Sequence, residues 1–153
     1  MSAPAPAPLI RQATVADLDL LVPLFDAYRQ FYGQPSDPGR ARSFLRDRFE
    51  HNQSVIFLAF DGESATGFTQ LYPSFSSGAL ARIFILNDLF VSPEARRKGT
   101  GSALLEAAAE FGRRVGALRL TLSTELTNST AQAVYERHGW KRDTTFCVYH
   151  LPL

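Results

Sequence analysis

A basic turn carrying two glycines, placed between an apolar strand and a helix, is the part of this sequence best suited to bind an anion. Residues 87–105 read NDLFVSPEARRKGTGSALL, with the turn RRKGTG at residues 96–101. Glycine lets the backbone approach a ligand closely, and the first amides of a helix lack intrahelical acceptors. Guanidinium groups suit a doubly charged pyrophosphate. The stretch therefore predicts a site for a nucleotide-type cofactor.

Two other glycine motifs are excluded by their spacing. A phosphate loop needs Gly-x-x-x-x-Gly-Lys-Ser/Thr, and no such run occurs. A dinucleotide fingerprint needs a third glycine three positions after the pair, where this chain has Leu104, and it belongs near the start of a βαβ unit. The plain alternative, in which the glycines only start a helix, stays open.

A second motif lies downstream, in NSTAQAVYERHGW at residues 128–140. Tyr135 follows Asn128 by seven residues, about two helical turns, so both side chains lie on nearly the same face. A tyrosine of pKa near 10 is protonated at neutral pH and can donate a proton to a thiolate. The alternatives are a core tyrosine and an asparagine that only caps its helix.

Together, the two motifs resemble the GNAT superfamily of acetyl-coenzyme A-dependent N-acetyltransferases. The first fits the pattern Gln/Arg-x-x-Gly-x-Gly/Ala after a strand, and the second fits a later helix that an Asn opens and Gly-aromatic closes. The resemblance implies acetyl-coenzyme A as co-substrate, no metal, and Tyr135 as the catalytic acid. It also implies a splayed strand pair at the cofactor site. The cofactor-binding residues that it implies are Leu89, Phe90, Val91, Arg96, Arg97, Lys98, Gly99, Thr100, Gly101, Ser102, Asn128 and Tyr135.

The acceptor side of the reaction is less defined. Some polyamine acetyltransferases of the family use a glutamate where this chain has Asn87, which cannot take a proton. Asp88 or Glu125 could act through water, or the amine could enter already neutral. Phe31, Tyr32 and Asp88 are the candidate substrate-binding residues, with core packing as the alternative for the aromatic residues, especially for Phe25 and Tyr28 earlier in the same helix.

Composition narrows the class of protein. The chain has 153 residues, a net charge of +1 and one cysteine, Cys147. These values fit one domain without an internal disulfide and give no sign of nucleic-acid binding. No apolar run reaches the roughly 20 residues of a membrane helix, and no signal-peptide pattern opens the chain. We expect a cytoplasmic protein with no membrane partner.

The pattern of elements predicts an α/β (α+β) fold of the GNAT type. Residues 1–8 read as a disordered Ala/Pro leader, and residues 9–153 as a single N-acetyltransferase domain. We expect a mixed, mostly antiparallel central sheet of six to seven strands flanked by about four helices. The helices are expected over residues 15–32, 38–51, 99–115 and 128–138, and the strands over residues 9–13, 54–60, 65–72, 83–91, 118–123, 140–143 and 145–150.

The sequence thus predicts an enzyme that moves an acetyl group from acetyl-coenzyme A to a primary amine of a small, polyamine- or amino-acid-like molecule by direct attack. Acetylation of a protein lysine or histone tail, and a non-catalytic regulator that binds coenzyme A, are the alternatives. Because relatives often pair through their C-terminal strands, a homodimer is expected to be possible.

Overall fold

The computed structural model describes residues 2–4 and 6–153. They form two compact units, Met1–Leu122 and Ser123–Leu153, which are described in turn. The predicted leader lies partly outside the described residues, at Met1 and Ala5, and its other residues have no helix or strand. That residues 9–153 act as one acetyltransferase domain stays a prediction.

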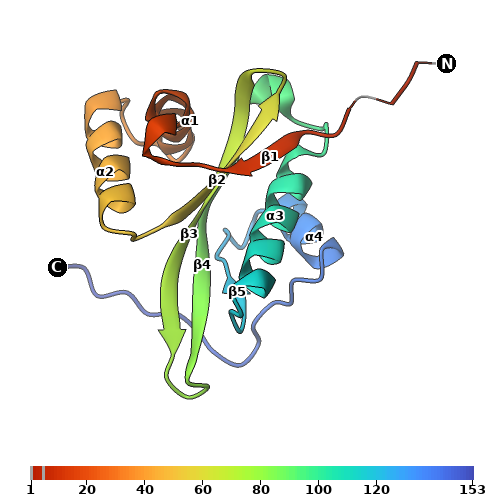
Figure 1. Cartoon of the computed structure of the whole chain (residues 1–153). Coiled ribbons are helices and arrows are strands. Elements are labelled where there is room, and N and C mark those ends of the chain that lie inside the picture. The colour runs from red at the N-terminus through yellow and green to blue at the C-terminus, as the bar shows by residue number, and fades with distance from the viewer. Residues whose placement is uncertain (1, 5) are drawn as a thin grey trace. The chain divides into compact units, whose positions relative to one another are not determined.

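The described residues of the first unit form five strands, three α-helices and two short 3-10 helices (Figure 1). In chain order they are β1 (Leu9–Gln12), η1 (Val15–Asp17), α1 (Leu18–Phe31), α2 (Pro38–Glu50), β2 (Val55–Asp61), β3 (Ser64–Ser76), β4 (Ala81–Val91), η2 (Pro93–Ala95), α3 (Thr100–Arg114) and β5 (Leu120–Thr121).

The strands form one mixed sheet in the order β1-β2-β3-β4-β5. The first three pairings are antiparallel, and β5 pairs with β4 in parallel after the crossover through α3. The expectation of six to seven, mostly antiparallel strands was therefore wrong for the described residues. The strand predicted at residues 118–123 does form, but it is limited to Leu120–Thr121.

Helices cover both faces of this sheet, with α1 and α2 on one face and α3 on the other (Figure 1). Under α1 and α2, the core is built around Phe25, Leu45 and Phe68. On the α3 face, the ring of Phe111 packs edge-on against Phe57 and Phe84. Each of these helices thus buries one apolar stripe, as the periodicity predicted.

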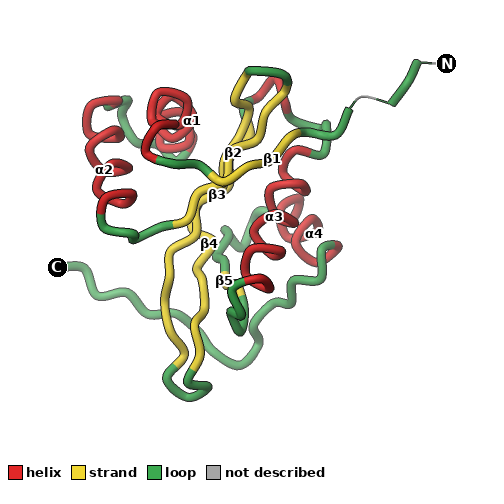
Figure 2. The backbone as a smooth tube through the Cα atoms, viewed as in Figure 1, coloured by secondary structure: helices red, strands yellow, loops and turns green. Residues whose placement is uncertain are grey.

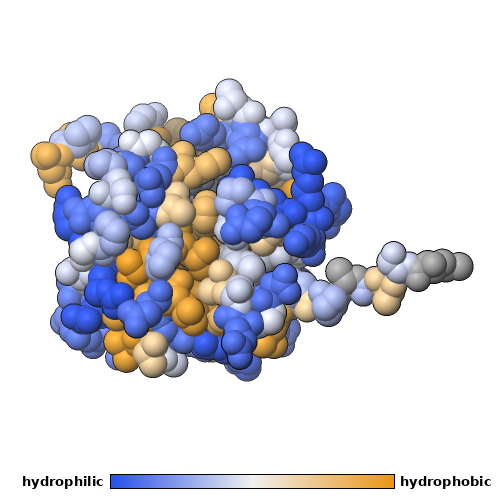
Figure 3. Space-filling model, turned by 90° about the horizontal axis from the view of Figure 1, so that it is seen from above, coloured by the Kyte–Doolittle hydropathy of each residue, from blue (hydrophilic) through white to orange (hydrophobic). Residues whose placement is uncertain are grey.

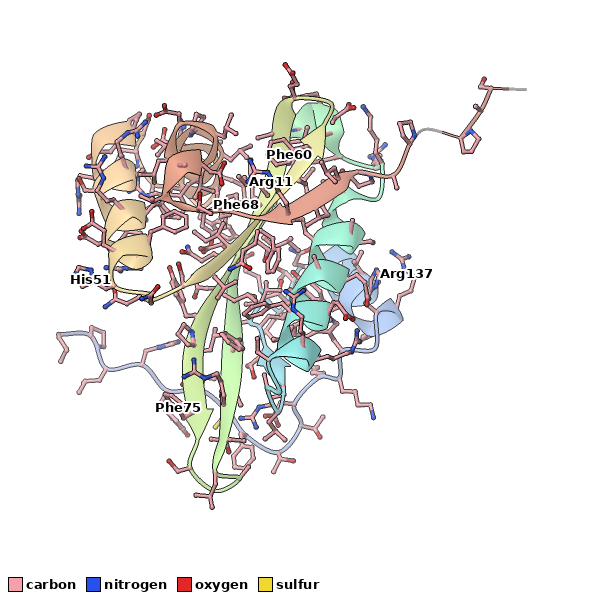
Figure 4. All side chains as sticks on the ribbon, in the orientation of Figure 1. Arg11, His51, Phe60, Phe68, Phe75 and Arg137 are labelled. Atoms are coloured by element: carbon pink, nitrogen blue, oxygen red, sulfur yellow. The ribbon has the colours of Figure 1, made fainter. Side chains whose placement is uncertain are left out.

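The start of α1 is fixed by an ion pair and a cap. Asp17 accepts a hydrogen bond from the backbone N–H of Thr14 at 2.8 Å and binds both terminal nitrogens of Arg11 at 2.8 and 2.9 Å. The same guanidinium lies 4.8 Å from the centre of the Phe60 ring (Figure 4). The first turn is a 3-10 helix, and the α-helix begins only at Leu18, so Pro23 lies early in α1. Of the two effects that the sequence predicted for Pro23, a kink or a late start, the late start is observed.

The second unit contains α4 (Ser129–Arg137), the fourth α-helix of the described chain. After α4 the chain runs as loop to its end (Figure 2). The strands predicted at residues 140–143 and 145–150 are therefore wrong. Between them, Asp143 Oδ1 accepts from the amides of Thr145 and Phe146 at 2.8 and 3.0 Å, which turns the backbone out of an extended path. The apolar alternation remains, but within this unit no strand lies beside it to pair.

Candidate active site

The turn that follows β4 has the backbone geometry of an anion cradle. Arg97 and Gly99 both adopt left-handed conformations, with φ of 64° and 79°, on either side of Lys98. Gly99 is also the N-cap of α3, and the hydrogen-bond ladder of the helix starts with Ala103 N donating to Gly99 O at 3.0 Å. The amides of the first turn thus have no acceptor in the helix itself. Such turns form concave sites for phosphate.

The three basic residues of the turn do not play the same part. All three are exposed, and the side chains of Arg97 and Lys98 make no hydrogen bond, ion pair or ring contact among the described residues. Arg96 folds back instead: its Nε donates to the Val91 carbonyl at 2.9 Å, and its guanidinium carbon lies 5.7 Å from the ring centres of Phe31 and of Phe90. The side chains of Arg97 and Lys98 are therefore fully available to an anion, and Arg96 is available only through its terminal nitrogens.

The small residues that open α3 differ in their surroundings. Thr100 is buried, and its hydroxyl donates to the Ala95 carbonyl at 3.5 Å, so its side chain supports the turn. At Gly101, a Cβ would meet nothing nearer than Val91 Cγ2 at 4.0 Å, and at Gly99 nothing within 4 Å. The fold itself would have room for a side chain at Gly101, so close approach of a ligand is the remaining reason for glycine there.

The end of β4 offers free backbone on one edge. Its pairing with β5 is confined to Phe84↔Leu120 and Ile85↔Thr121, whereas β4 continues to Val91. On the other edge, Leu89, Phe90 and Val91 pair with β3. The Phe90 side chain is buried among aromatic rings, and those of Leu89 and Val91 are half-buried. Because the Val91 carbonyl already accepts from Arg96 Nε, the open groups are the other backbone groups of this edge. An extended ligand can add to such an edge as a strand does.

A β-bulge at Asn87 decides which face of the sheet Asp88 occupies. Leu71 pairs with Leu86 and Gln70 with Asp88, so Asn87 is an extra residue in β4. Cross-strand partners share a face, whereas neighbours along a strand alternate. Asp88 therefore points toward α1 and α2, while Leu86 points toward α3. A regular strand would have placed both on the α3 face.

The Asp88 carboxylate is almost fully buried, at 2 % exposure, and two amides hold it in place. Gln70 Nε2 donates to Oδ2 at 2.5 Å, and Asn87 Nδ2 donates to Oδ1 at 2.9 Å. Burial first, and then the Asp88 charge, raise the pKa of Tyr28 and of Tyr72. Both hydroxyls therefore keep their protons even more firmly than an ordinary tyrosine and are potential donors beside a single carboxylate.

A cavity of about 350 Å³ opens over this carboxylate. Its lining comes from α1, α2, β3 and β4, and consists of Phe25, Tyr28, Arg29, Arg40, Ala41, Phe44, Tyr72, Asn87 and Asp88. The volume lies at the small end of ligand pockets. An acid at the base and aromatic walls suit a small amine with an apolar body.

Phe31 and Tyr32, two of the predicted substrate residues, do not line this cavity. Both are exposed, at 65 % and 55 %. Phe31 and Tyr32 lie between this cavity and the cofactor turn. The Tyr32 ring centre lies 5.0 Å from that of Tyr28, which lines the cavity, and the guanidinium of Arg96 in the turn lies over the Phe31 ring. Phe25 lies in the core and Tyr28 packs against it, as the sequence favoured, and both also line the cavity.

The second unit carries Asn128 and Tyr135. Asn128 caps α4, since its Oδ1 accepts from the Ala131 amide at 3.1 Å. Tyr135 lies in the last turns of α4, half-buried, with its ring 6.2 Å from that of Trp140. The cap role allowed for Asn128 is therefore observed.

Sequence reasoning missed Gln70, Tyr72, Arg29 and Arg40. A glutamine within the apolar strand GFTQLY was the one available signal for the first of these. The arginines look like ordinary surface charges in the sequence. Within residues 2–4 and 6–153, no group of three or more His, Cys, Asp or Glu side chains is arranged to hold a metal ion. Across the same residues, every helix is too short or too polar to cross a bilayer.

Comparisons with known proteins identify the family. The model of the acetyltransferase (GNAT) family matches residues 21–140. YhfO, an uncharacterised N-acetyltransferase of Bacillus subtilis, is 49 % identical over 142 residues, which cover 93 % of this chain and 95 % of YhfO. A "probable acetyltransferase" of Haemophilus influenzae is 36 % identical over 141 residues, or 90 % of this chain and 92 % of that protein. The crystal structure of a probable acetyltransferase superposes with a TM-score of 0.90 at 47 % identity, covering 95 % of this chain and 97 % of the other.

The chain belongs to the GNAT acetyltransferase family and is an acyltransferase. Acetyltransferases of this family generally use acetyl-coenzyme A. The left-handed turn, the exposed Arg97 and Lys98, and the room at Gly101 fit the diphosphate of that donor.

Proposed function

We propose that this enzyme acetylates a primary amine of a small molecule with acetyl-coenzyme A. The observation that carries the proposal is the layout of β4. One strand bears the buried Asp88 carboxylate of the acceptor cavity, a free backbone edge at Leu89 to Val91, and the anion turn directly after it. Asp88 and Val91 are separated by about 10 Å of strand, so the two substrates would meet along β4.

The donor would be held by backbone more than by side chains. The amides from Lys98 to Ser102 and the charges of Arg97 and Lys98 would bind the diphosphate. The open edge at Leu89 to Val91 would pair with the amides of the pantetheine arm, and one of its N–H groups would stabilise negative charge on the acetyl oxygen. Arg96 would hold the end of β4 in place through its hydrogen bond to the Val91 carbonyl.

The acceptor amine would bind at Asp88. A lysine-type amine is almost wholly protonated at pH 7 and must lose a proton before it attacks. Asp88 is the one carboxylate in the cavity lining, and the amides of Gln70 and Asn87 fix its orientation. We assign it the role of holding the ammonium and accepting its proton, directly or through a water molecule.

The leaving group would be protonated by Tyr135. In the reaction, the amine nitrogen forms a bond to the acetyl carbon, the bond from that carbon to sulfur breaks, and the thiolate takes up one proton. The support for Tyr135 is its motif, seven residues after Asn128 in the helix that Asn128 caps. Asn128 would act through this cap and through contact with the donor.

The size of the cavity favours a small acceptor over a protein lysine or histone tail. About 350 Å³ accommodates a small metabolite, and the arginines of its lining repel basic peptides. A regulator that binds coenzyme A without turnover is the other alternative, and the measurements below distinguish it from an enzyme. The homodimer stays a prediction.

Two measurements on the same preparation test the proposal. Coenzyme A should raise the melting temperature, because it binds the folded state. Acetyl-coenzyme A with a panel of amines should release free thiol, and Asp88→Asn should remove most of this release while keeping the thermal shift. A thermal shift without thiol release for any amine would favour the regulator. No thermal shift would overturn the proposal.

A further inference from the structure

The acceptor cavity carries charges of both signs. Asp88 supplies one negative charge at its buried base, and Arg29 and Arg40 supply two positive charges in the lining. A third guanidinium, that of Arg48, lies 4.3 Å over the ring of Phe44, and its charge acts on Tyr72. A cavity built to hold a purely cationic molecule would be expected to carry acids along its length.

The positive charges are only partly neutralised by the protein. Arg29 donates to the Pro35 carbonyl at 3.1 Å and lies 3.7 Å from Asp26 Oδ1. Across the described chain, the Arg40 guanidinium makes no ion pair or hydrogen bond, and Arg48 Nε is buried without a partner. Arg40 in particular has all five donors available for an anion.

The end of the cavity at Asp88 favours a cation, whereas the arginines favour an anion. Gln70 Nε2 and Asn87 Nδ2 hold the two oxygens of Asp88, and Gln70 Oε1 is buried without a hydrogen-bond partner among the described residues. Gln70 Oε1 is therefore an acceptor beside Asp88 that lacks a donor. An ammonium group has three donors and no acceptor, so it matches this end and not the arginine end.

We infer that the acceptor is an amine that carries its own anionic group, as an amino acid does, with the ammonium at Asp88 and the carboxylate at Arg40. The inference rests on the proposed function and narrows it. A polyamine would place its second ammonium among the arginines, where like charges repel. A carboxylate in the same place gains charge-assisted hydrogen bonds that guanidinium groups form best.

Matched acceptors isolate the anionic group. Lysine, lysinamide and 1,5-diaminopentane share an aminoalkyl chain, and lysinamide differs from lysine only in the missing charge at the carboxyl group. The same comparison is made for other amino acids of either hand and their amides, with spermidine as the polyamine. We expect kcat/KM for the best amino acid to exceed that for its amide at least about tenfold, because a charged hydrogen bond is lost.

Arg40→Ala links this preference to the site. The variant should bring the ratio of amino acid to amide close to one, while the melting temperature in coenzyme A stays that of the wild type. Arg46→Ala, on the exposed side of the same helix and outside the cavity lining, is the control and should keep the ratio. Since Arg40 is exposed, the variant is expected to fold.

Each outcome decides a separate question. Thiol release that is faster with spermidine, 1,5-diaminopentane or the amides than with amino acids would overturn this inference and leave the proposed function intact. An Arg40→Ala variant that weakens coenzyme A binding instead would assign the arginine to the donor and also overturn it. No release with any amine would overturn the proposed function and this inference with it.

Discussion

Arg96, in the turn after β4, is hydrogen-bonded to the last residue of that strand: Arg96 Nε donates to the Val91 carbonyl at 2.9 Å. The guanidinium is held further by Phe31 and Phe90, whose ring centres both lie 5.7 Å away. Two adjacent arginines of one turn therefore have different tasks, one structural and one directed to solvent. This difference is open to test by substitution.

Arg97→Ala and Lys98→Ala should each weaken coenzyme A binding about threefold to tenfold, because each removes a charged contact to phosphate. Arg96→Ala should change affinity less and lower stability more. Calorimetric titration at two salt concentrations measures both affinity and its salt dependence, which should fall only for Arg97 and Lys98. Arg46→Ala serves as the control for net charge. Equal effects at Arg96 and Arg97 would contradict the division of roles.

Gly101→Ala should separate ligand binding from folding. The new Cβ finds Val91 Cγ2 no nearer than 4.0 Å, and alanine favours a helix, so stability should hold or rise by about 0.5–1 kcal/mol. Coenzyme A affinity should fall, and fall further in Gly101→Val. Urea denaturation and calorimetry measure the two quantities. Unchanged affinity in both variants would mean that the turn only starts the helix.

On the face of the molecule that Figure 3 shows, hydrophobic side chains gather in a band that hydrophilic ones border. Arg97 is strained at φ of 64°, so Arg97→Gly should stabilise the fold by up to about 1 kcal/mol while still losing affinity for coenzyme A. Thermal melting with and without coenzyme A measures both effects. A variant that loses stability would show that the Arg97 side chain packs in the turn.

Tyr135→Phe should leave coenzyme A affinity nearly unchanged and lower kcat on the order of 10²-fold, the usual effect of losing a general acid. Tyr149→Phe, an exposed tyrosine of the same unit, is the matched control. Steady-state kinetics across pH make the comparison. Activity of the phenylalanine variant equal to wild type at every pH would remove Tyr135 from its proposed role.

The cap at the start of α1 predicts a pH-dependent loss of stability. The hydrogen bonds from Arg11, followed by that from the Thr14 amide, hold the pKa of Asp17 below its usual value. A lowered folded-state pKa stabilises the fold above the unfolded value of about 3.9, and this contribution is lost as pH falls through the folded value. Asp17→Asn should therefore cost about 1 kcal/mol at pH 7.

Urea denaturation at pH 7, 5 and 3.5 measures this difference between Asp17→Asn and the wild type. The difference should be constant between pH 7 and 5 and shrink below about pH 4, where the Asp17 carboxyl of the unfolded chain begins to take up its proton. Asp19→Asn controls for a neighbouring carboxylate that is mostly exposed. A difference that grows on acidification would have the wrong sign.

The parts of the fold that the sequence predicted are those with local causes. Glycine at positions 99 and 101, the basic triplet and the cap at Asn128 determine the turn and two helices within a few residues of chain. The predicted strands after residue 139 failed because a strand needs a neighbour, and alternation in one segment says nothing about whether a neighbour is present. The same reason limits β5 to two residues.

The acceptor cavity was only partly predicted for a different reason. Asp88 was a candidate, but simple alternation places it on the same face as Leu86 and away from α1 and α2. The bulge at Asn87 reverses this assignment, and it arises from the register of β4 against β3 rather than from the residue types. Its neighbours Tyr72 and Arg40 come together only through the fold.

The most direct test of the account is an amide-resolved NMR titration of the labelled protein with coenzyme A. The account predicts that the largest shifts fall on the amides of Lys98, Gly99 and Gly101 and on the edge of β4 at Leu89 to Val91. Saturable binding that leaves these amides unmoved and shifts another region would contradict it.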